Sequence, residues 1–202
     1  MRLFVESGSP AEIEQLASWG VLSGATTSLI ASPPGEVGAA GETIAALCDL
    51  LEGPVVVELR ASDAVAMVEE GIALAQLHEH AAVKLPFSRA ALAATSALAE
   101  QEIAVELTHV YAAAQALLAA EAGATWVSCP LATLEDASID AGETLQAVIE
   151  TLHTGQSEAE VLVSGIRSPQ HVVLAARLGA ELAAVPPAVL EQMLDHPLSP
   201  GR

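Results

Sequence analysis

The fold is decided by residues 81–129, which read AAVKLPFSRAALAATSALAEQEIAVELTHVYAAAQALLAAEAGATWVSC. This stretch holds three short apolar runs, at Ala82–Lys84, Ala104–Leu107 and Trp126–Cys129. Two longer segments separate them, and in these segments apolar residues recur every three or four positions. Short apolar runs indicate buried strands, and apolar residues that recur every three or four positions indicate amphipathic helices. Strands that alternate with helices predict a parallel sheet covered by helices.

The same alternation extends over the rest of the chain. Strands are predicted at Arg2–Val5, Gly24–Thr26, Val55–Leu59, Ala82–Lys84, Ala104–Leu107, Trp126–Cys129, Glu160–Val163 and Leu182–Val185. Helices are predicted at Pro10–Trp19, Gly41–Leu51, Asp63–Glu79, Ser88–Gln101, Val110–Ala122, Gly142–His153, Ser168–Leu178 and Pro187–Leu194. Residues 33–35 and Leu134–Ala141 are predicted to be loops.

This element order predicts an α/β fold, a single closed (β/α)8 TIM barrel over residues 1–202. An open doubly wound sheet is the alternative, and it would need an edge strand and a switch point. No change of composition along the chain indicates a domain boundary.

The composition excludes several classes of protein. Hydrophobic residues make up 52% of the chain, which excludes intrinsic disorder. A formal net charge of −19 opposes binding to nucleic acid and to anionic membrane surfaces. Neither a transmembrane run nor a signal peptide is expected, because no apolar stretch is long enough. The two cysteines, Cys48 and Cys129, make no disulfide framework, so we expect a cytoplasmic protein. We expect its partner to be a small-molecule substrate rather than nucleic acid or a membrane.

Lysine usage singles out one residue. The chain has 7 basic residues, and only Lys84 among them is a lysine. It lies in the apolar run Ala81–Phe87, where burial of an ammonium group is costly. Active sites of (β/α)8 barrels form at the carboxyl ends of the strands, and a lysine there suits iminium (Schiff-base) chemistry with a ketone or aldehyde. A structural lysine whose ammonium reaches solvent is the alternative.

Further candidate residues lie near or just beyond the carboxyl ends of the predicted strands. They are Glu6, Thr26, Ser28, Glu58, Thr108, Gly165 and Arg167. Alternation along a strand puts Glu106 on the same face as Thr108, inside the barrel. Together, Glu6, Glu58 and Glu106 would form an acidic pocket that disfavours anionic substrates and tolerates neutral or amine-bearing ones.

No motif for a metal or an organic cofactor is recognised. His78 and His80 are two residues apart at a predicted helix end, so they would face different sides. Zinc spacing, a glycine-rich dinucleotide motif, a phosphate-binding loop and a nucleophile elbow are not found. We predict neither a metal nor a cofactor, because an iminium formed on the lysine is itself an electron sink.

Five motifs carry a resemblance that extends from Leu3 to Met193. They are Gly24–Ser28, Val83–Pro86, Leu107–Tyr111, Ala114–Leu118 and Ala122–Ala124. In content and spacing they resemble the transaldolase and fructose-6-phosphate aldolase family. The resemblance implies a (β/α)8 barrel that makes or breaks a carbon–carbon bond beside a ketone.

The resemblance also implies roles for four residues. Lys84 matches the lysine that forms the Schiff base. Glu58 and Thr108 match the pair that positions a water for proton transfer while the carbinolamine loses water. Glu6 lies where the family has an aspartate, the base that takes the hydroxyl proton of the donor. Glutamate at the Glu58 position is typical of the transaldolases, whereas the fructose-6-phosphate aldolases have glutamine.

The chain departs from the family pattern where substrate binds. Ser28 and Leu29 stand in place of an Asn-Pro pair, and Glu6 is one methylene longer than aspartate. Residues 129–134 lack both the aromatic acid/base partner and the arginine that binds phosphate. We predict that substrate is bound by Thr26, Ser28, Glu106, Gly165 and Arg167.

Three hypotheses follow from these patterns. The first is a lysine-dependent aldolase or transaldolase with altered donor specificity. The second is an iminium-forming carbon–carbon bond enzyme that acts on an unphosphorylated or amine-bearing substrate. The third is a degenerate barrel that binds without catalysis. Family members extend into a further helix that contacts a neighbouring subunit, whereas the match here stops near Met193, so we expect a homo-oligomer smaller than a decamer.

Overall fold

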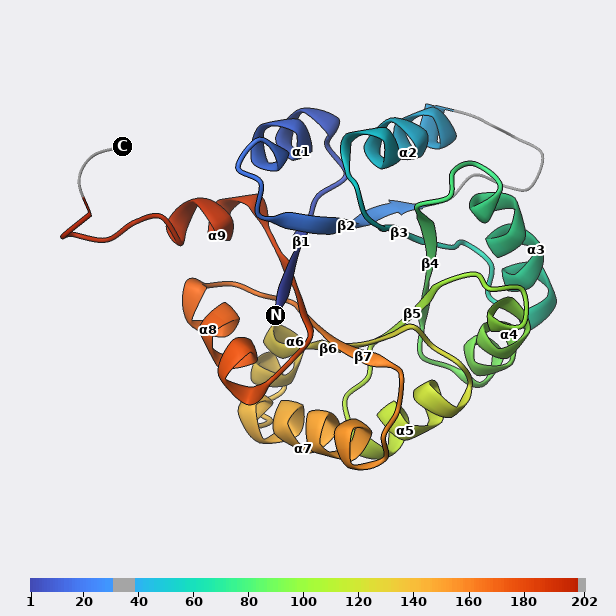
Figure 1. Ribbon diagram of the computed structural model, residues 1–202. Coiled ribbons are helices and arrows are strands. Elements are labelled where there is room, and N and C mark those ends of the chain that lie inside the picture. The colour runs from blue at the N-terminus through green and yellow to red at the C-terminus, as the bar shows by residue number, and fades with distance from the viewer. Residues whose placement is uncertain (31–38, 200–202) are drawn as a thin grey trace.

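The strands close into a barrel in sequence order. The computed structural model describes residues 1–30 and 39–199. The strands are β1 Arg2–Glu6, β2 Leu22–Ile30, β3 Val55–Glu58, β4 Ala81–Pro86, β5 Val105–Thr108, β6 Trp126–Pro130, β7 Glu160–Ser164 and β8 Leu182–Val185. Each pairs in parallel with the next, and β8 pairs with β1, so no strand is left at an edge (Figure 1). The predicted (β/α)8 barrel is confirmed, and the open doubly wound sheet is excluded.

Helices surround the barrel on its outer side (Figure 1). They are α1 Pro10–Ala17, α2 Ala39–Leu50, α3 Ala64–Ala75, α4 Arg89–Ala99, α5 Ala113–Glu121, α6 Leu131–Asp136, α7 Ala141–Thr154, α8 Pro169–Leu178 and α9 Pro187–Gln192. None of the helices among the described residues is long and apolar enough to span a lipid bilayer.

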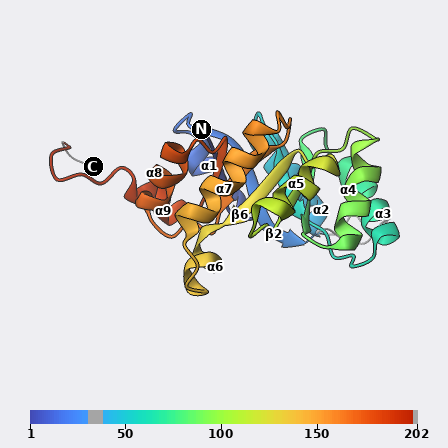
Figure 2. The same cartoon turned by 90° about the horizontal axis from the view of Figure 1, so that it is seen from below.

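The short helix α6 was not predicted from the sequence. The predicted loop Leu134–Ala141 contains the end of α6 and the first residue of α7. Six residues are less than two helical turns, so α6 has too few apolar positions to show a helical period. Figure 2 shows α6 projecting from the ring of helices.

Local signals fix where the main helices begin and end. Asp63, Ser88 and Asp140 accept hydrogen bonds from backbone N–H groups three residues ahead, at 3.0, 3.0 and 2.9 Å. Gly179 ends α8 at φ +95°, in the left-handed region that residues with a side chain rarely adopt. Asp63 and Ser88 begin their helices at the mouth of the barrel, whereas Gly179 ends α8 at the opposite end, before β8.

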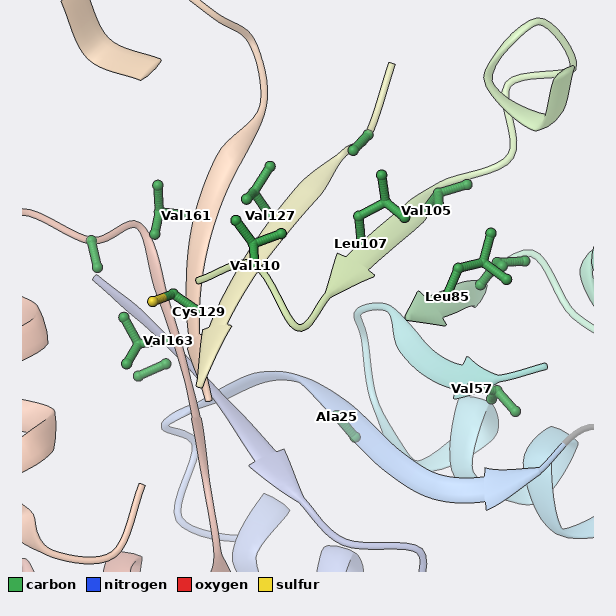
Figure 3. Close-up of a cluster of buried hydrophobic side chains, with 14 of the residues drawn as sticks. Ala25, Val57, Leu85, Val105, Leu107, Val110, Val127, Cys129, Val161 and Val163 are labelled. Atoms are coloured by element: carbon green, nitrogen blue, oxygen red, sulfur yellow. The ribbon is translucent and has the colours of Figure 1, made fainter. Parts of the chain in front are cut away.

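Alternation along the strands divides their side chains between two cores. Outward-facing residues such as Val57, Leu85 and Val127 pack beneath the helices in the larger core (Figure 3). The second cluster fills the inside of the barrel, and it consists of Phe4, Val56, Ala82, Trp126, Leu162, Leu182 and Ala184. The rings of Phe4 and Trp126 meet edge to face, with centroids 6.0 Å apart. The barrel interior at this level is a packed apolar floor rather than a channel.

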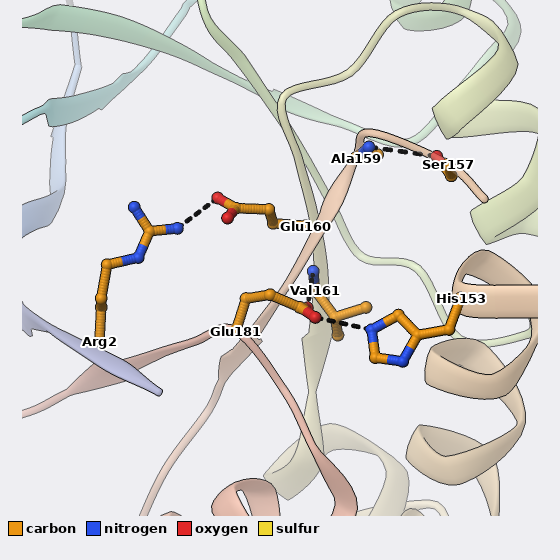
Figure 4. A network of polar contacts seen from close by, with 7 residues as sticks. All are labelled: Arg2, His153, Ser157, Ala159, Glu160, Val161 and Glu181. Atoms are coloured by element: carbon orange, nitrogen blue, oxygen red, sulfur yellow. Dashed lines mark hydrogen bonds and ion pairs between the residues drawn. The ribbon is translucent and has the colours of Figure 1, made fainter.

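Polar contacts join β1, β7 and α7 to their neighbours at the amino-terminal end of the barrel. Arg2 at the start of β1 contacts Glu160 at the start of β7 (Figure 4). Glu181 receives a hydrogen bond from the N–H of Val161 at 2.8 Å and also contacts the ring of His153 at 2.6 Å (Figure 4). These contacts lie at the end opposite the one where active sites of this fold form.

Candidate active site

Polar side chains follow the apolar floor toward the carboxyl ends of the strands. A residue two positions beyond a lumen-facing residue also faces the lumen. At that spacing from floor residues lie Glu6, Glu58, Lys84, Ser128 and Ser164. Glu106 follows the partly buried Ala104, which packs against the same floor. The lumen therefore changes from an apolar floor to a polar mouth that contains three carboxyl groups and one amine.

Lys84 lies between carboxyl-bearing residues of both neighbouring strands. In the ladder its Cα pairs with Glu58 of β3 on one side and with Glu106 of β5 on the other. The side chain is half-buried, and its Nζ donates a hydrogen bond to the carbonyl oxygen of Thr27 at 3.3 Å. Paired residues of adjacent strands lie about 4.8 Å apart, so both carboxyl groups are within reach of the amine directly or through one water.

Glu106 is the most deeply buried carboxyl group of the mouth. Its side chain is 1% exposed, and its Oε2 has no hydrogen-bond partner in the described parts of the chain. Burial raises the pKa of Glu106, because water no longer stabilises the carboxylate. The Lys84 ammonium and the Ser128 hydroxyl oppose this rise in pKa, whereas the neighbouring carboxylates Glu6 and Glu58 add to it. The sequence prediction that Glu106 faces the lumen agrees with this environment.

Glu6 ends β1 at the rim of the mouth, where solvent still reaches it. The surrounding barrel removes enough water to raise the pKa of its carboxyl group, and the Lys84 ammonium partly offsets that rise. A carboxylate with a raised pKa is a stronger base, which suits a group that takes a proton from a hydroxyl.

Thr108 and Thr26 supply buried hydroxyl groups to the same region. Thr108 ends β5 and is 7% exposed, and its carbonyl oxygen receives the N–H of Phe87 at 2.8 Å. The next residue, His109, has φ +62°, so the chain turns sharply after the strand. Thr26 pairs with Glu6, and its buried Oγ1 has no hydrogen-bond partner among the residues that the structure describes.

Comparison with known proteins shows which family the chain belongs to. A family model described as Transaldolase/Fructose-6-phosphate aldolase matches residues 38–200. The chain belongs to this family. A protein of Thermus thermophilus named a probable transaldolase is 41% identical over 207 residues, which cover 98% of this chain and 93% of the relative. A protein of the same name from Chlorobium phaeovibrioides is 38% identical over 206 residues, again covering 98% and 93%.

Solved structures agree on the fold. The thiamine phosphate pyrophosphorylase of Pyrococcus furiosus matches with a TM-score of 0.67 and 16% identity, over 94% of this chain and 87% of that one. At this identity the likeness shows the fold alone. The relatives in the transaldolase and fructose-6-phosphate aldolase family carry the functional information, and they indicate an enzyme of the transaldolase and aldolase type.

Arg167, the basic residue after β7 that is predicted to bind substrate, is already paired. Arg167 is exposed, and its two terminal nitrogens contact the two carboxylate oxygens of Asp136 at 2.7 and 2.6 Å. The hydrogen bonds from Arg167 hold the pKa of Asp136 below its ordinary value. Next to them, His171 lies 3.2 Å from Glu135. An anionic substrate group would therefore compete with Asp136 for the guanidinium.

Gly165 and Ser28 complete the residues predicted to bind substrate. Gly165 has φ +62°, and a Cβ there would lie 3.3 Å from the backbone nitrogen of Ala132 at the start of α6. The backbone geometry thus accounts for glycine at this position. Ser28 lies in β2, but its side chain falls outside the described part of the structure.

Three residues near the mouth were not predicted from the sequence: Ser128, Ser164 and Glu70. The Ser128 and Ser164 hydroxyl groups lie 2.9 Å apart, and counting two positions from Trp126 and Leu162 would have found them. Glu70 of α3 accepts the N–H groups of Arg60 and Ala61 at 3.0 and 2.8 Å, which fixes the turn after β3. Nothing in the helical pattern distinguishes Glu70 from a surface glutamate.

The described residues offer no ready metal site. Across 1–30 and 39–199, no three His, Cys, Asp or Glu side chains gather closely enough to hold a metal ion.

Proposed function

We propose that this protein is a lysine-dependent aldolase or transaldolase in which Lys84 forms an iminium with a ketone donor. One observation carries the proposal: the lysine of β4 faces the mouth of the barrel with a carboxyl-bearing residue in register on each side. Family membership supports the same reaction type. A neutral amine is the nucleophile, and the iminium that it forms withdraws electrons from the adjacent carbon.

The first half of the reaction makes the iminium. The Nζ of Lys84 attacks the ketone carbon, and the carbonyl oxygen becomes the hydroxyl of a carbinolamine. Glu58 and Thr108, which end the strands on either side of β4, hold a water that carries a proton to this hydroxyl. Loss of water then leaves the iminium.

The second half breaks the carbon–carbon bond. Glu6 takes the proton of the donor hydroxyl, and the bond breaks between the carbon that bears this hydroxyl and the carbon next to the iminium. The electron pair of the broken bond moves into the iminium and gives an enamine. An aldehyde leaves, and a second aldehyde or a proton can then react with the enamine. The raised pKa of Glu6 favours its service as the base.

Reductive trapping tests this proposal. Incubation with dihydroxyacetone or fructose 6-phosphate followed by borohydride is expected to leave one stable adduct, because the only candidate amines are Lys84 and the amino terminus. Mass spectrometry should find the added mass on the peptide that contains Lys84. Arg89→Lys, which adds an exposed amine at the start of α4, is the control and should leave the adduct on Lys84 alone. An adduct that persists in Lys84→Arg would refute the assignment.

A second candidate function changes the substrate and keeps the chemistry. We propose that the donor is unphosphorylated or carries an amine. The pairing of Arg167 with Asp136 and the three carboxyl groups of the mouth favour this hypothesis, because both disfavour the binding of an anionic substrate group.

Donor selectivity follows from the same features. We expect dihydroxyacetone to compete well with its phosphate ester, with kcat/KM values within about tenfold, or about 1.4 kcal/mol. Steady-state assays of both donors with one aldehyde acceptor measure this ratio. A preference of several thousandfold for the phosphate ester would show that an anion site exists at the mouth. No turnover with any ketone, together with measurable ligand binding, would favour the non-catalytic barrel.

A further inference from the structure

The deeply buried carboxyl group of Glu106 has no role in the reaction proposed above. It is a carboxyl group inside the barrel, 1% exposed, with Oε2 unpartnered among the described protein groups. Buried polar atoms in folded proteins are almost always hydrogen-bonded. An unpaired buried carboxyl oxygen therefore indicates that the group carries a proton or that a water or a ligand atom binds there. On the β4 side, the residue that pairs with it in the ladder is Lys84.

The charges that face Glu106 come from three other strands. Lys84 of β4 attracts a negative charge on it, whereas Glu6 of β1 and Glu58 of β3 repel one. From β6, the Ser128 hydroxyl favours the carboxylate, and the unpartnered indole nitrogen of Trp126 lies in register. Lys84, Glu6 and Glu58 are all less buried than Glu106. Of these four titratable groups, Glu106 is the one on which a charge is least solvated.

We propose that Glu106 holds the proton that Lys84 must lose to become a nucleophile and gives it back when the carbinolamine loses water. This role rests on the proposed iminium function and adds a fourth acid/base residue to it. The transfer runs through one water, since the two side chains make no direct contact among the hydrogen bonds and ion pairs of the described residues.

The proton balance of the first step is internal. The ammonium of Lys84 and the carboxylate of Glu106 become a neutral amine and a neutral carboxylic acid. No charge leaves the lumen, and the more deeply buried group becomes uncharged. This direction is favoured because an unsolvated carboxylate in a protein interior is costly.

The second step returns the proton. The neutral amine, the ketone and the carboxylic acid of Glu106 give an iminium, a carboxylate and one water. The proton leaves with the former carbonyl oxygen through the water held by Glu58 and Thr108. The iminium is positively charged, so it then lies beside a negative Glu106, and the two charges stabilise each other.

Glu106→Gln tests the role, because glutamine has the same shape and cannot accept the proton. The rate of adduct formation, measured by rapid mixing with dihydroxyacetone followed by borohydride, is expected to fall about a hundredfold or more at neutral pH. The rate should recover as the pH rises, since solvent base then removes the Lys84 proton. KM should change less than kcat, and Glu106→Asp should restore part of the rate.

The control is Glu14→Gln, a glutamate on the exposed surface of α1, which should match the wild type. A Glu106→Gln variant with the wild-type rate and pH profile would overturn the proposal and leave the iminium function intact. Absence of an adduct in the wild-type protein would overturn both.

Stability against pH gives a readout that does not depend on turnover. A carboxyl group whose pKa is higher in the folded than in the unfolded protein destabilises the fold as the pH rises from the unfolded pKa to the folded pKa. Glu106→Gln removes this pH-dependent destabilisation. The unfolding free energy of the variant minus that of the wild type should therefore rise as the pH passes through this window and stay constant above it. Parallel curves would show that Glu106 does not retain a proton and would also overturn the proposal.

Discussion

Lys84→Arg is expected to lower kcat/KM for aldol cleavage by about 10⁴-fold or more. A guanidinium remains protonated at any accessible pH, so it cannot attack the ketone, although it keeps the positive charge between Glu58 and Glu106. Loss of a covalent nucleophile removes the reaction path itself, and its effect is larger than that of an acid or a base. Coupled assays of cleavage with the two purified proteins measure the ratio.

The same variant separates catalysis from folding. The Lys84 side chain is half-buried and makes one hydrogen bond among the described residues, to the Thr27 carbonyl. Arginine can make that bond from a longer side chain, so the circular dichroism spectrum and the thermal midpoint should stay close to those of the wild type. Residual cleavage within tenfold of the wild type would rule out Lys84 as the nucleophile.

The barrel could be predicted from the sequence because its elements carry strong periods. The apolar runs of β3 to β6 and the helical spacing of α3 to α5 are local properties that need no knowledge of tertiary contacts. Helix α6 could not be predicted, because six residues do not establish a period. Strand β2 extends to Ile30, beyond its predicted end at Thr26, since its pairing with β3 resumes there after a register shift.

The lumen-facing residues were predictable to the extent that alternation decides them. Glu106 was placed inside the barrel by counting two residues back from Thr108, and its burial agrees. The pairing of Arg167 with Asp136 was not predictable, because the two residues are 31 positions apart, with Asp136 at the end of α6 and Arg167 after β7. Its consequence for anion binding therefore emerges only from the folded chain.

Phe4→Ala is expected to lower the free energy of unfolding by about 3–5 kcal/mol. Phe4 is 0% exposed and packs against Trp126 in the apolar floor of the barrel. Its removal leaves a cavity lined by barrel strands, which are joined to their neighbours by hydrogen bonds and cannot move inward to fill it. The ring packs closely against the backbone of β2, because a Cβ on Gly24 would lie 2.7 Å from the Cε1 of Phe4.

Urea unfolding of the wild type and the variant measures this loss, with an unchanged m-value as the sign that both unfold in the same way. Val173→Ala is the matched control, since Val173 is 55% exposed on α8 and its truncation should change the free energy of unfolding by less than about 0.5 kcal/mol. If Phe4→Ala cost no more than this control, the apolar floor would not contribute to stability. In that case the floor beneath Lys84 and Glu106 would not be rigid. The outer core alone would then have to hold the polar side chains of the mouth in position.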